Sequence, residues 1–204
     1  RILRYAATLL PTPRMRSLYY TYAYPHFIGA IGIWGTQNTA KQYIQPLVRA
    51  QKKIIRIICR ADPRTPTAPL MKRLSLLNLT NLYTLRVCAE MHPFVHPSAD
   101  KTTTINRPQH DNTYIAITDV HTHATRYSKG HIFSPNTNKY SKTKQPTHTI
   151  AHFTELHSTV WNTLPQQLKN TTSLTVFKRQ LKEHLLIEQE KTYTLESTQG
   201  HHLA

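Results

Sequence analysis

Five basic side chains recur at helical spacing early in the chain, and no acidic residue lies among them. They are Arg49, Lys52, Lys53, Arg56 and Arg60. At about 100° per residue, these positions form a stripe along one side of a helix. Clustered Lys and Arg side chains bind phosphate groups, which gives affinity for a nucleic-acid backbone without base preference. The stripe therefore predicts backbone binding, against the alternative of an ordinary solvated helix face.

The segment that must carry this stripe is apolar on its other side. Pro46 suits the first turn of a helix, and no further Gly or Pro occurs before Ala61. The residues that we expect on the buried face are Leu47, Ala50, Gln51, Ile54, Ile57, Ile58 and Ala61. We therefore predict a helix from Pro46 to Ala61, with one face toward a protein core and the other toward an anionic partner.

The residue types that support catalysis or metal binding show no productive spacing. Up to residue 155 the acidic residues are isolated, so no adjacent pair could hold two magnesium ions. They are Asp62, Glu90, Asp100, Asp111, Asp119 and Glu155. The five glycines form no phosphate-binding loop or nucleophile elbow. Cys59 and Cys88 provide no paired zinc ligands for the nine histidines between His92 and His157. We expect no catalytic residue, cofactor or metal in this chain.

The net charge and the hydropathy of the chain limit the classes of molecule that it is expected to bind. The 204 residues include 26 Lys and Arg against 10 Asp and Glu, a net charge of +16. Such an excess favours nucleic acid first and an anionic membrane surface second. Residues 1–92 carry 14 basic and 2 acidic side chains, whereas residues 151–204 are neutral overall. The longest apolar run, Phe27–Trp34, is shorter than the roughly 20 residues of a bilayer span. We expect no membrane insertion and, with two cysteines, an intracellular location, nuclear or cytoplasmic.

Periodicity and breakers predict a mainly α-helical fold with a compact, basic helical subdomain over residues 1–92. Within it we expect helices over Arg14–Tyr24, Pro69–Leu74 and Asn81–His92, in addition to the basic helix. Periodicity leaves Phe27–Trp34 open between a buried helix and a buried strand, and its helical neighbours favour the helix. Pro25 should close the first of these, since proline cannot continue a helix without losing a hydrogen bond. Asn78 or Thr80 should cap the last.

The remaining chain divides by composition. Residues 93–150 are rich in Thr, His, Asn and Pro, which predicts long loops or partial disorder with a weak strand signal at Tyr114–Ile117. Residues 151–188 form a helical segment whose amphipathic helix should be capped by Ser173. Its expected buried residues are Leu174, Phe177, Leu181 and Leu185. Residues 189–204 are polar, and we expect a frayed tail.

Aromatic residues lie among cations before the basic helix. The group comprises Arg16, Tyr19, Tyr20, Tyr22, Tyr24 and His26. Tyrosines can stack on unpaired bases, but an aromatic stripe at helical spacing more often belongs to a core. Both interpretations remain open from the sequence.

Four stretches, in order, resemble one family. They are Leu18–Pro25 with Ile33–Gly35; Leu47–Ile58; Thr67–Leu74 with Leu76–Leu79 and Leu82–Tyr83; and His123–Tyr127, Trp161–Pro165 and Phe177–Lys182. Together they resemble the segment downstream of the polymerase palm in LINE-type (non-LTR, jockey-like) retrotransposon reverse transcriptases. The resemblance implies a fragment without the catalytic site, in which the basic helical subdomain over residues 1–92 is thumb-like. A start at Arg1 rather than Met agrees with the expectation of a fragment. It also implies that RNA or DNA backbone and the missing palm are partners, that magnesium belongs to that palm, and that this fragment alone is not an enzyme.

The chain departs from the family pattern at three places. Gly29 and Ala30 stand where Tyr-Gly is usual, Pro66 where a histidine is common, and Thr159–Val160 where Gly-Pro often occurs. These departures fit a diverged copy. Two alternatives therefore stay open: a non-catalytic scaffold module whose basic face docks on an acidic surface of the palm, and an inactive pseudogene product that does not fold stably.

Overall fold

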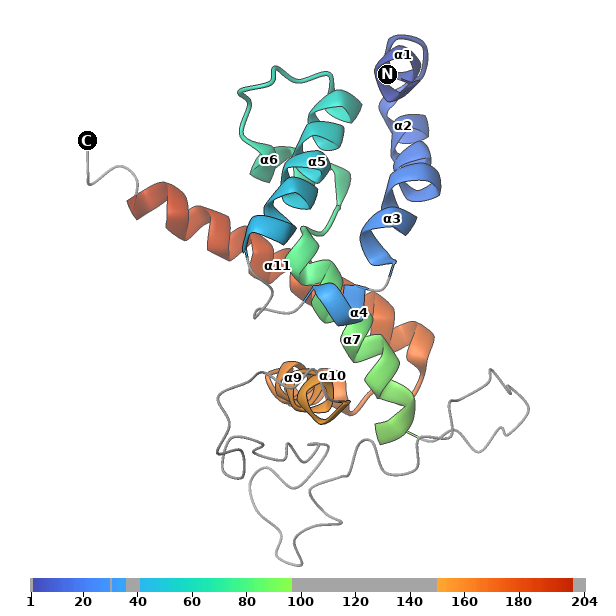
Figure 1. The fold of residues 1–204 in the computed structure, drawn as a ribbon, viewed down its shortest axis with the longest axis vertical. Coiled ribbons are helices and arrows are strands. Elements are labelled where there is room, and N and C mark those ends of the chain that lie inside the picture. Colours follow the sequence, from blue (N-terminus) through green and yellow to red (C-terminus); the bar gives the residue numbers. More distant parts are fainter. Residues whose placement is uncertain (1, 30, 36–40, 97–149, 200–204) are drawn as a thin grey trace, which may run out of the picture. The chain divides into compact units, whose positions relative to one another are not determined.

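A computed structural model describes residues 2–29, 31–35, 41–96 and 150–199, and all regular structure in these ranges is helical (Figure 1). The expected mainly α-helical fold is thus confirmed. The polar region from 97 to 149, with the strand signal at Tyr114–Ile117 and the motif His123–Tyr127, lies outside the described residues. The chain divides into an N-terminal unit, residues 1–86 with 182–204, and a central unit, residues 87–181. These divisions differ from the composition changes near residues 92, 150 and 188.

The N-terminal unit begins with α1 (Ile2–Leu9), and the helix breaks after it at Leu10 and Pro11. A continuous helical rod follows, formed by α2 (Thr12–Leu18), the π-helical turn η1 (Tyr19–Ala23) and α3 (Tyr24–Ile28). Pro25 was expected to end this helix and does not. The π turn, in which the Tyr24 N–H donates to the Tyr19 carbonyl, places Pro25 in the first turn of α3. A missing N–H costs little at that position, because the first N–H groups of a helix have no partner within it.

Helix α4 (Ile31–Trp34) confirms the helical interpretation of the apolar run, with an interruption after Ile28. Gly35 follows directly, and its N–H donates to the Ile31 carbonyl at 2.8 Å. A side chain at Gly35 would meet that carbonyl oxygen at 2.6 Å and the Tyr83 ring at 2.9 Å. Only glycine therefore allows this close approach.

The basic helix α5 extends over Lys41–Cys59, so Pro46 lies inside it and does not begin it. Pro46 removes one hydrogen bond, to the Gln42 carbonyl one turn earlier. Gln42 is exposed, so water can satisfy that carbonyl. The prediction failed because a proline near the N-terminal end of a helix marks its first turn only when the preceding residues are poor helix formers.

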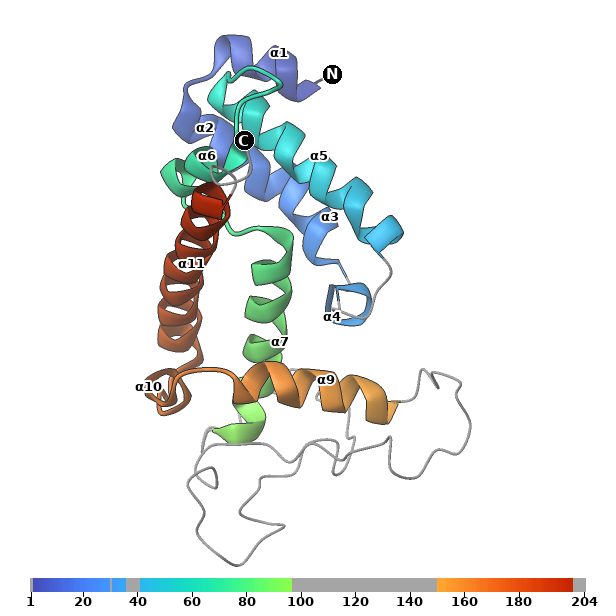
Figure 2. The same ribbon diagram turned by 90° about the vertical axis from the view of Figure 1, so that its left-hand side faces the viewer.

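The buried face of α5 is rotated from the predicted one. Gln51, Ile55 and Ile58 are at most 1% exposed, although Ile55 was not among the residues expected to face the core. The other expected residues, which are Leu47, Ala50, Ile54, Ile57 and Ala61, are half-buried. Helix α5 contacts α1, α2 and α6 (Thr67–Leu74), so burial is spread around more of its circumference than for a helix with one neighbour (Figures 1 and 2).

Helices α5 and α6 end in the same way, on a residue with left-handed backbone. Arg60 has φ of 53° and Ser75 has φ of 51°. At each end the N–H group of this residue and that of the residue after it donate to carbonyls of the last helical turn, as in a Schellman motif. Glycine usually occupies this position because it has no Cβ to clash, so both side chains are held there against a backbone preference.

Helix α7 (Leu79–Val95) begins where the sequence predicted a cap. Asn78 accepts a hydrogen bond from the Asn81 N–H through Oδ1 at 2.9 Å, which is the bond of an N-cap residue. The helix then continues three residues past the expected end at His92, with Pro93 inside it. Leu82 and Cys88 lie on its buried side.

Helix α11 (Leu174–Gln199) contributes to both units and continues beyond Glu188, where a frayed tail was expected. Within the N-terminal unit Gln189 is only 5% exposed. Its amide donates to the Leu76 carbonyl at 3.2 Å and accepts from the Asn78 N–H at 2.8 Å. On the turn between α6 and α7, Gln51 donates to the Leu77 carbonyl at 2.9 Å.

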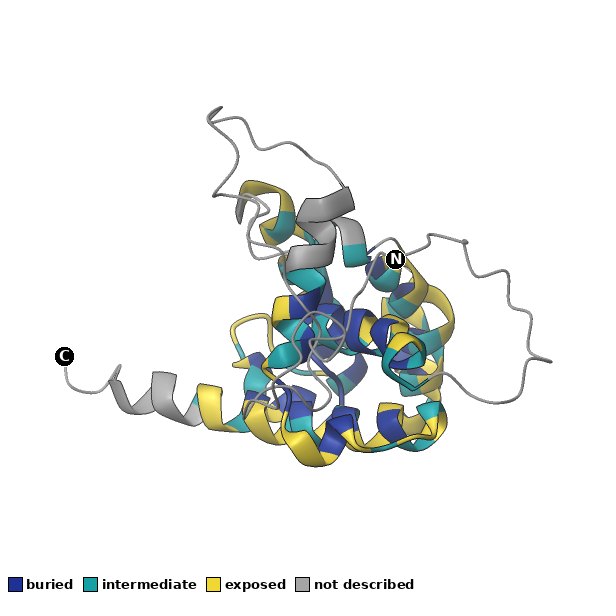
Figure 3. Ribbon diagram, turned by 90° about the horizontal axis from the view of Figure 1, so that it is seen from below, coloured by how far each residue is buried: buried dark blue, intermediate teal, exposed yellow. Residues whose placement is uncertain are grey.

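The central unit contains α9 (Ile150–Asn162), α10 (Gln166–Lys169) and parts of α7 and α11. Trp161 and Phe177 are fully buried, with ring centroids 5.6 Å apart. The Phe177 N–H donates to the Ser173 carbonyl at 2.8 Å, so Ser173 precedes α11 as predicted. Buried and exposed positions alternate along the helices (Figure 3), which confirms the amphipathic pattern read from the sequence.

Replacing Gln189 with Met should lower the free energy of unfolding by about 2 kcal/mol. The side chain keeps its length, but the Leu76 carbonyl and the Asn78 N–H lose their partner in a buried turn. Urea denaturation measures the difference. Gln45→Met, at an exposed position of α5, is the control and should change stability by less than about 0.5 kcal/mol. Equal midpoints for both variants and the parent would contradict the role given to Gln189.

Replacing Ser75 with Gly should raise the free energy of unfolding by about 0.5–1 kcal/mol, because the left-handed backbone no longer carries a Cβ. Arg60→Gly relieves the same conformation but removes side-chain hydrogen bonds, so it should not stabilise the chain. Thermal melts followed by circular dichroism compare the two variants. A lower melting temperature for Ser75→Gly would refute this account of the turn.

Candidate nucleic-acid interface

Three cations of the predicted stripe are free to meet a ligand. Arg49, Lys52 and Lys53 are exposed on α5, and no hydrogen bond or ion pair joins them to any residue that the structure describes. Helix α5 itself contains no acidic residue. These three positions satisfy what the sequence predicted: a cationic face turned away from the core.

Arg56 was predicted to bind a ligand but contributes to the fold. Its guanidinium is half-buried, and Nε donates to the Thr65 carbonyl at 2.8 Å. The bond fixes the loop between α5 and α6 to the helix. Arg56 is therefore removed from the free stripe, since moving it toward a phosphate would release that loop carbonyl.

Arg60, the last predicted site residue, joins α5 to α1. Nε donates to the Ala7 carbonyl at 2.8 Å, and Nη2 donates to the Leu10 carbonyl at 2.8 Å. Both acceptors lie at the C-terminal end of α1, where carbonyls lack helical partners and carry partial negative charge. Arg60 thus caps α1, and periodicity could not reveal this because the partners are about 50 residues away.

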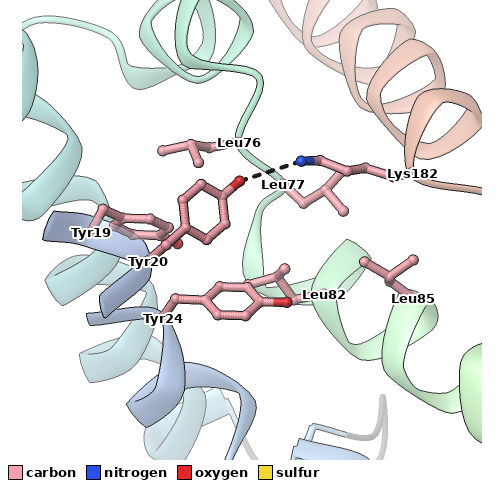
Figure 4. A pocket seen from close by; sticks show the side chains of 8 residues that line it. All are labelled: Tyr19, Tyr20, Tyr24, Leu76, Leu77, Leu82, Leu85 and Lys182. Carbon is pink, nitrogen blue, oxygen red and sulfur yellow. Dashed lines mark hydrogen bonds between the residues drawn. The ribbon is translucent and has the colours of Figure 1, made fainter. Parts of the chain in front are cut away.

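The tyrosines of the early aromatic group mostly belong to the core. Tyr19 is 1% exposed and accepts a hydrogen bond from the Gln51 amide at 3.2 Å. Burial raises the pKa of Tyr19 to about 12. The rings of Tyr20 and Tyr24 lie 5.3 Å apart, in the cluster seen in Figure 4. Tyr22, at 64% exposure, is the member of this group with a free surface for a base.

Two cations outside the predicted stripe gather at Tyr20. The guanidinium carbon of Arg16 and the ammonium nitrogen of Lys182 each lie 5.7 Å from the centre of its ring. Lys182 comes from α11 and donates to the Tyr20 hydroxyl at 3.3 Å (Figure 4). Arg16 and Tyr20 belong to the early aromatic group noted in the sequence, but Lys182 could not be placed beside them because it is 162 residues from Tyr20 along the chain.

The titratable residues buried in the central unit have structural partners. Lys169 is 2% exposed and donates to the Asn162 carbonyl, at the end of α9, at 2.9 Å. Burial lowers the pKa of Lys169. Burial also raises the pKa of Cys88 to about 12, so the thiol stays protonated at neutral pH and is a poor nucleophile.

His92 is the buried histidine of this unit. Nε2 donates to the Thr171 carbonyl at 2.7 Å, and the imidazole lies against Phe177 with ring centroids 4.6 Å apart. Burial lowers the pKa of His92; the bond to Thr171 opposes that shift, and nearby His96 and Lys178 add to it. Its ring is therefore a neutral part of the core near pH 7.

Within the described ranges, no three His, Cys, Asp or Glu side chains converge where they could hold a metal ion. None of the described helices has both the length and the hydrophobicity to span a bilayer. No protein-family model, curated protein or solved structure matches the chain. The candidate site that remains is the cationic face of α5.

Burial of His92 predicts a loss of stability in mild acid. Because its folded-state pKa is lowered from the ordinary value of 6.5, the unfolded chain takes up a proton first as the pH falls. The free energy of unfolding should thus be fully retained above pH 6.5 and decrease as the pH falls through the folded-state pKa. Urea denaturation at about pH 7.5 and about pH 5 measures the loss. His92→Gln should show a smaller loss; an equal one would contradict the assignment.

Proposed function

We propose that the chain binds the sugar–phosphate backbone of a nucleic acid through Arg49, Lys52 and Lys53. The observation that carries this proposal is their exposure together on one helix without an anionic neighbour in it. The N-terminal unit strengthens the attraction, because it holds 16 basic against 5 acidic residues. Such contacts give affinity that depends on salt and not on base sequence.

The spacing of the three cations suits a polyphosphate chain. Residues three and four apart lie on one side of a helix, and Arg49 and Lys53 are separated by about 6 Å along its axis. A nucleic-acid strand carries one charge per about 3.4 Å of duplex axis. The face therefore spans about two phosphates of one strand, which favours several weak contacts in parallel.

The resemblance of the sequence motifs suggests the larger protein in which this binding would take place. In a retroelement reverse transcriptase, a basic helical segment after the palm would hold the RNA–DNA template–primer while the palm and its magnesium ions perform synthesis. Arg49, Lys52 and Lys53 would then retain substrate, and the partners of the chain would be the nucleic-acid backbone and the palm. No residue of this chain takes a chemical step in that scheme.

A second candidate is an interaction module, and the surface of α1 favours it. Ile2, Tyr5 and Leu9 share one side of that helix and are 84%, 72% and 65% exposed. Such a face suits a protein surface better than phosphate. On this alternative the cations of α5 dock on an acidic protein and bind nucleic acid only weakly.

Neutralising the free stripe should weaken nucleic-acid binding and its salt dependence together. For the Arg49→Gln, Lys52→Gln, Lys53→Gln variant, the slope of log K against log salt should fall by about 2–3, since each lost phosphate contact contributes about 0.9. Fluorescence anisotropy with an RNA–DNA duplex, titrated at several KCl concentrations, measures the slope.

A control distinguishes binding by this face of α5 from a general effect of the net charge of the chain. Lys178 and Arg179 form an adjacent exposed pair on α11, so Lys178→Gln, Arg179→Gln can be compared with Lys52→Gln, Lys53→Gln. Only the α5 pair should reduce affinity. Equal reductions would contradict a specific face, and weak binding by the parent chain would favour the interaction module. A thermal melt without a cooperative transition would instead support the inactive product.

A further inference from the structure

The N-terminal unit contains an open pocket of about 570 Å³ beside the rod of α2 and η1. It is lined by Thr12, Pro13, Arg16, Ser17, Tyr20, Arg73, Leu74, Ser75 and Lys182. The lining comes from α2, η1, the end of α6 and α11, so segments far apart in the sequence build it. Its volume falls within the range of about 300–1,000 Å³ typical of small-molecule sites.

The charge of the pocket has one sign. Arg16, Arg73 and Lys182 line it, and no carboxylate does. Three cations that share one cavity repel one another, and an anion among them would offset that repulsion. The pocket is therefore electrostatically complementary to a multiply charged anion.

The cations also have donors to spare. Arg16 is half-buried. Its Nε has no exposed surface and no hydrogen-bond partner among the described residues, so the Nη groups are the donors that a ligand in the pocket would meet. Lys182 makes a 3.3 Å hydrogen bond to the Tyr20 hydroxyl, which uses one of the three donors of an ammonium group. Arg73 is exposed at the mouth of the pocket and has no partner in the described part of the chain. A phosphate group presents the acceptors that these donors lack.

Ser75 adds to the same surface. Its left-handed backbone would suit glycine better, yet a serine, whose side chain carries a hydroxyl group, lines the pocket here. The C-terminal carbonyls of α6 would repel an anion if they were free. Two of them, those of Met71 and Lys72, accept hydrogen bonds from the Leu76 and Ser75 N–H groups.

We propose that this pocket binds the phosphoryl group of a phosphate ester or diphosphate, held by Arg16, Arg73 and Lys182. The site is separate from the free cations of α5 and does not depend on their proposed role. Two sources share the required chemistry: a free nucleotide or pyrophosphate, and the terminal phosphate of a nucleic-acid strand.

Isothermal titration calorimetry of the full chain with pyrophosphate, at constant ionic strength set with KCl, tests the site. We expect saturable binding, weakened at least about tenfold by Arg73→Gln and by Lys182→Gln. Arg64→Gln removes the same charge from an exposed position in the loop between α5 and α6, outside both proposed sites, and should leave the affinity within about twofold. Arg73 is exposed, so its variant should fold, and thermal melts check both proteins.

Competition experiments distinguish the sources. If a 5′-phosphorylated oligonucleotide displaces pyrophosphate at least about tenfold better than its 5′-hydroxyl form, the ligand is a strand terminus. If ADP displaces it and the two oligonucleotides do not differ, the ligand is a free nucleotide. Absence of saturable binding, or an equal loss in Arg73→Gln and Arg64→Gln, would overturn the proposal. Loss of duplex binding in the α5 variants would not affect it.

Discussion

The packing of the N-terminal unit depends on hydrogen-bond partners for the backbone N–H and C=O groups of the buried turn between α6 and α7. Leu76, Leu77 and Leu79 are all less than 5% exposed, so water cannot serve the polar groups between them. Unpaired backbone groups would be costly there. Gln51 from α5 and Gln189 from α11 supply the missing partners.

This pair of glutamines also fixes both candidate binding surfaces. Gln51 anchors α5 from inside, directly before the exposed Lys52 and Lys53. Gln189 anchors the helix that carries Lys182, one of the residues that line the pocket beside α2. The helices that carry the cations of both surfaces are therefore held in position before a ligand binds, which reduces the conformational entropy lost on binding.

The sequence predicted the features that depend on local periodicity and capping. The helical class, the Asn78 cap and the buried positions Phe177, Leu181 and Leu185 could all be read from nearby residues. Three of the five cations of the stripe are also exposed and without a partner among the described residues, as expected. The functional role of that stripe remains a prediction.

The features that sequence reasoning missed depend on distant partners. Arg56 and Arg60 look like their neighbours in a helical projection, but each donates to a carbonyl supplied by another segment. Gln189 looks like part of a polar tail until the turn at Leu76 requires a donor. Pro46 shows a second reason why a prediction failed: a long helix can accommodate a single proline, so proline alone does not mark where a helix begins.

The π turn at Tyr19–Ala23 has a consequence for how this chain can change in length. Deleting one residue there would allow an uninterrupted α-helix, whose local backbone geometry is better. The same deletion would turn every later position of the rod by about 100° and carry Phe27, now buried, around toward solvent. The extra residue sets the rotation about the helix axis between the residues before the π turn and those after it. The locally unfavourable turn is retained because the burial of Phe27 requires that rotation.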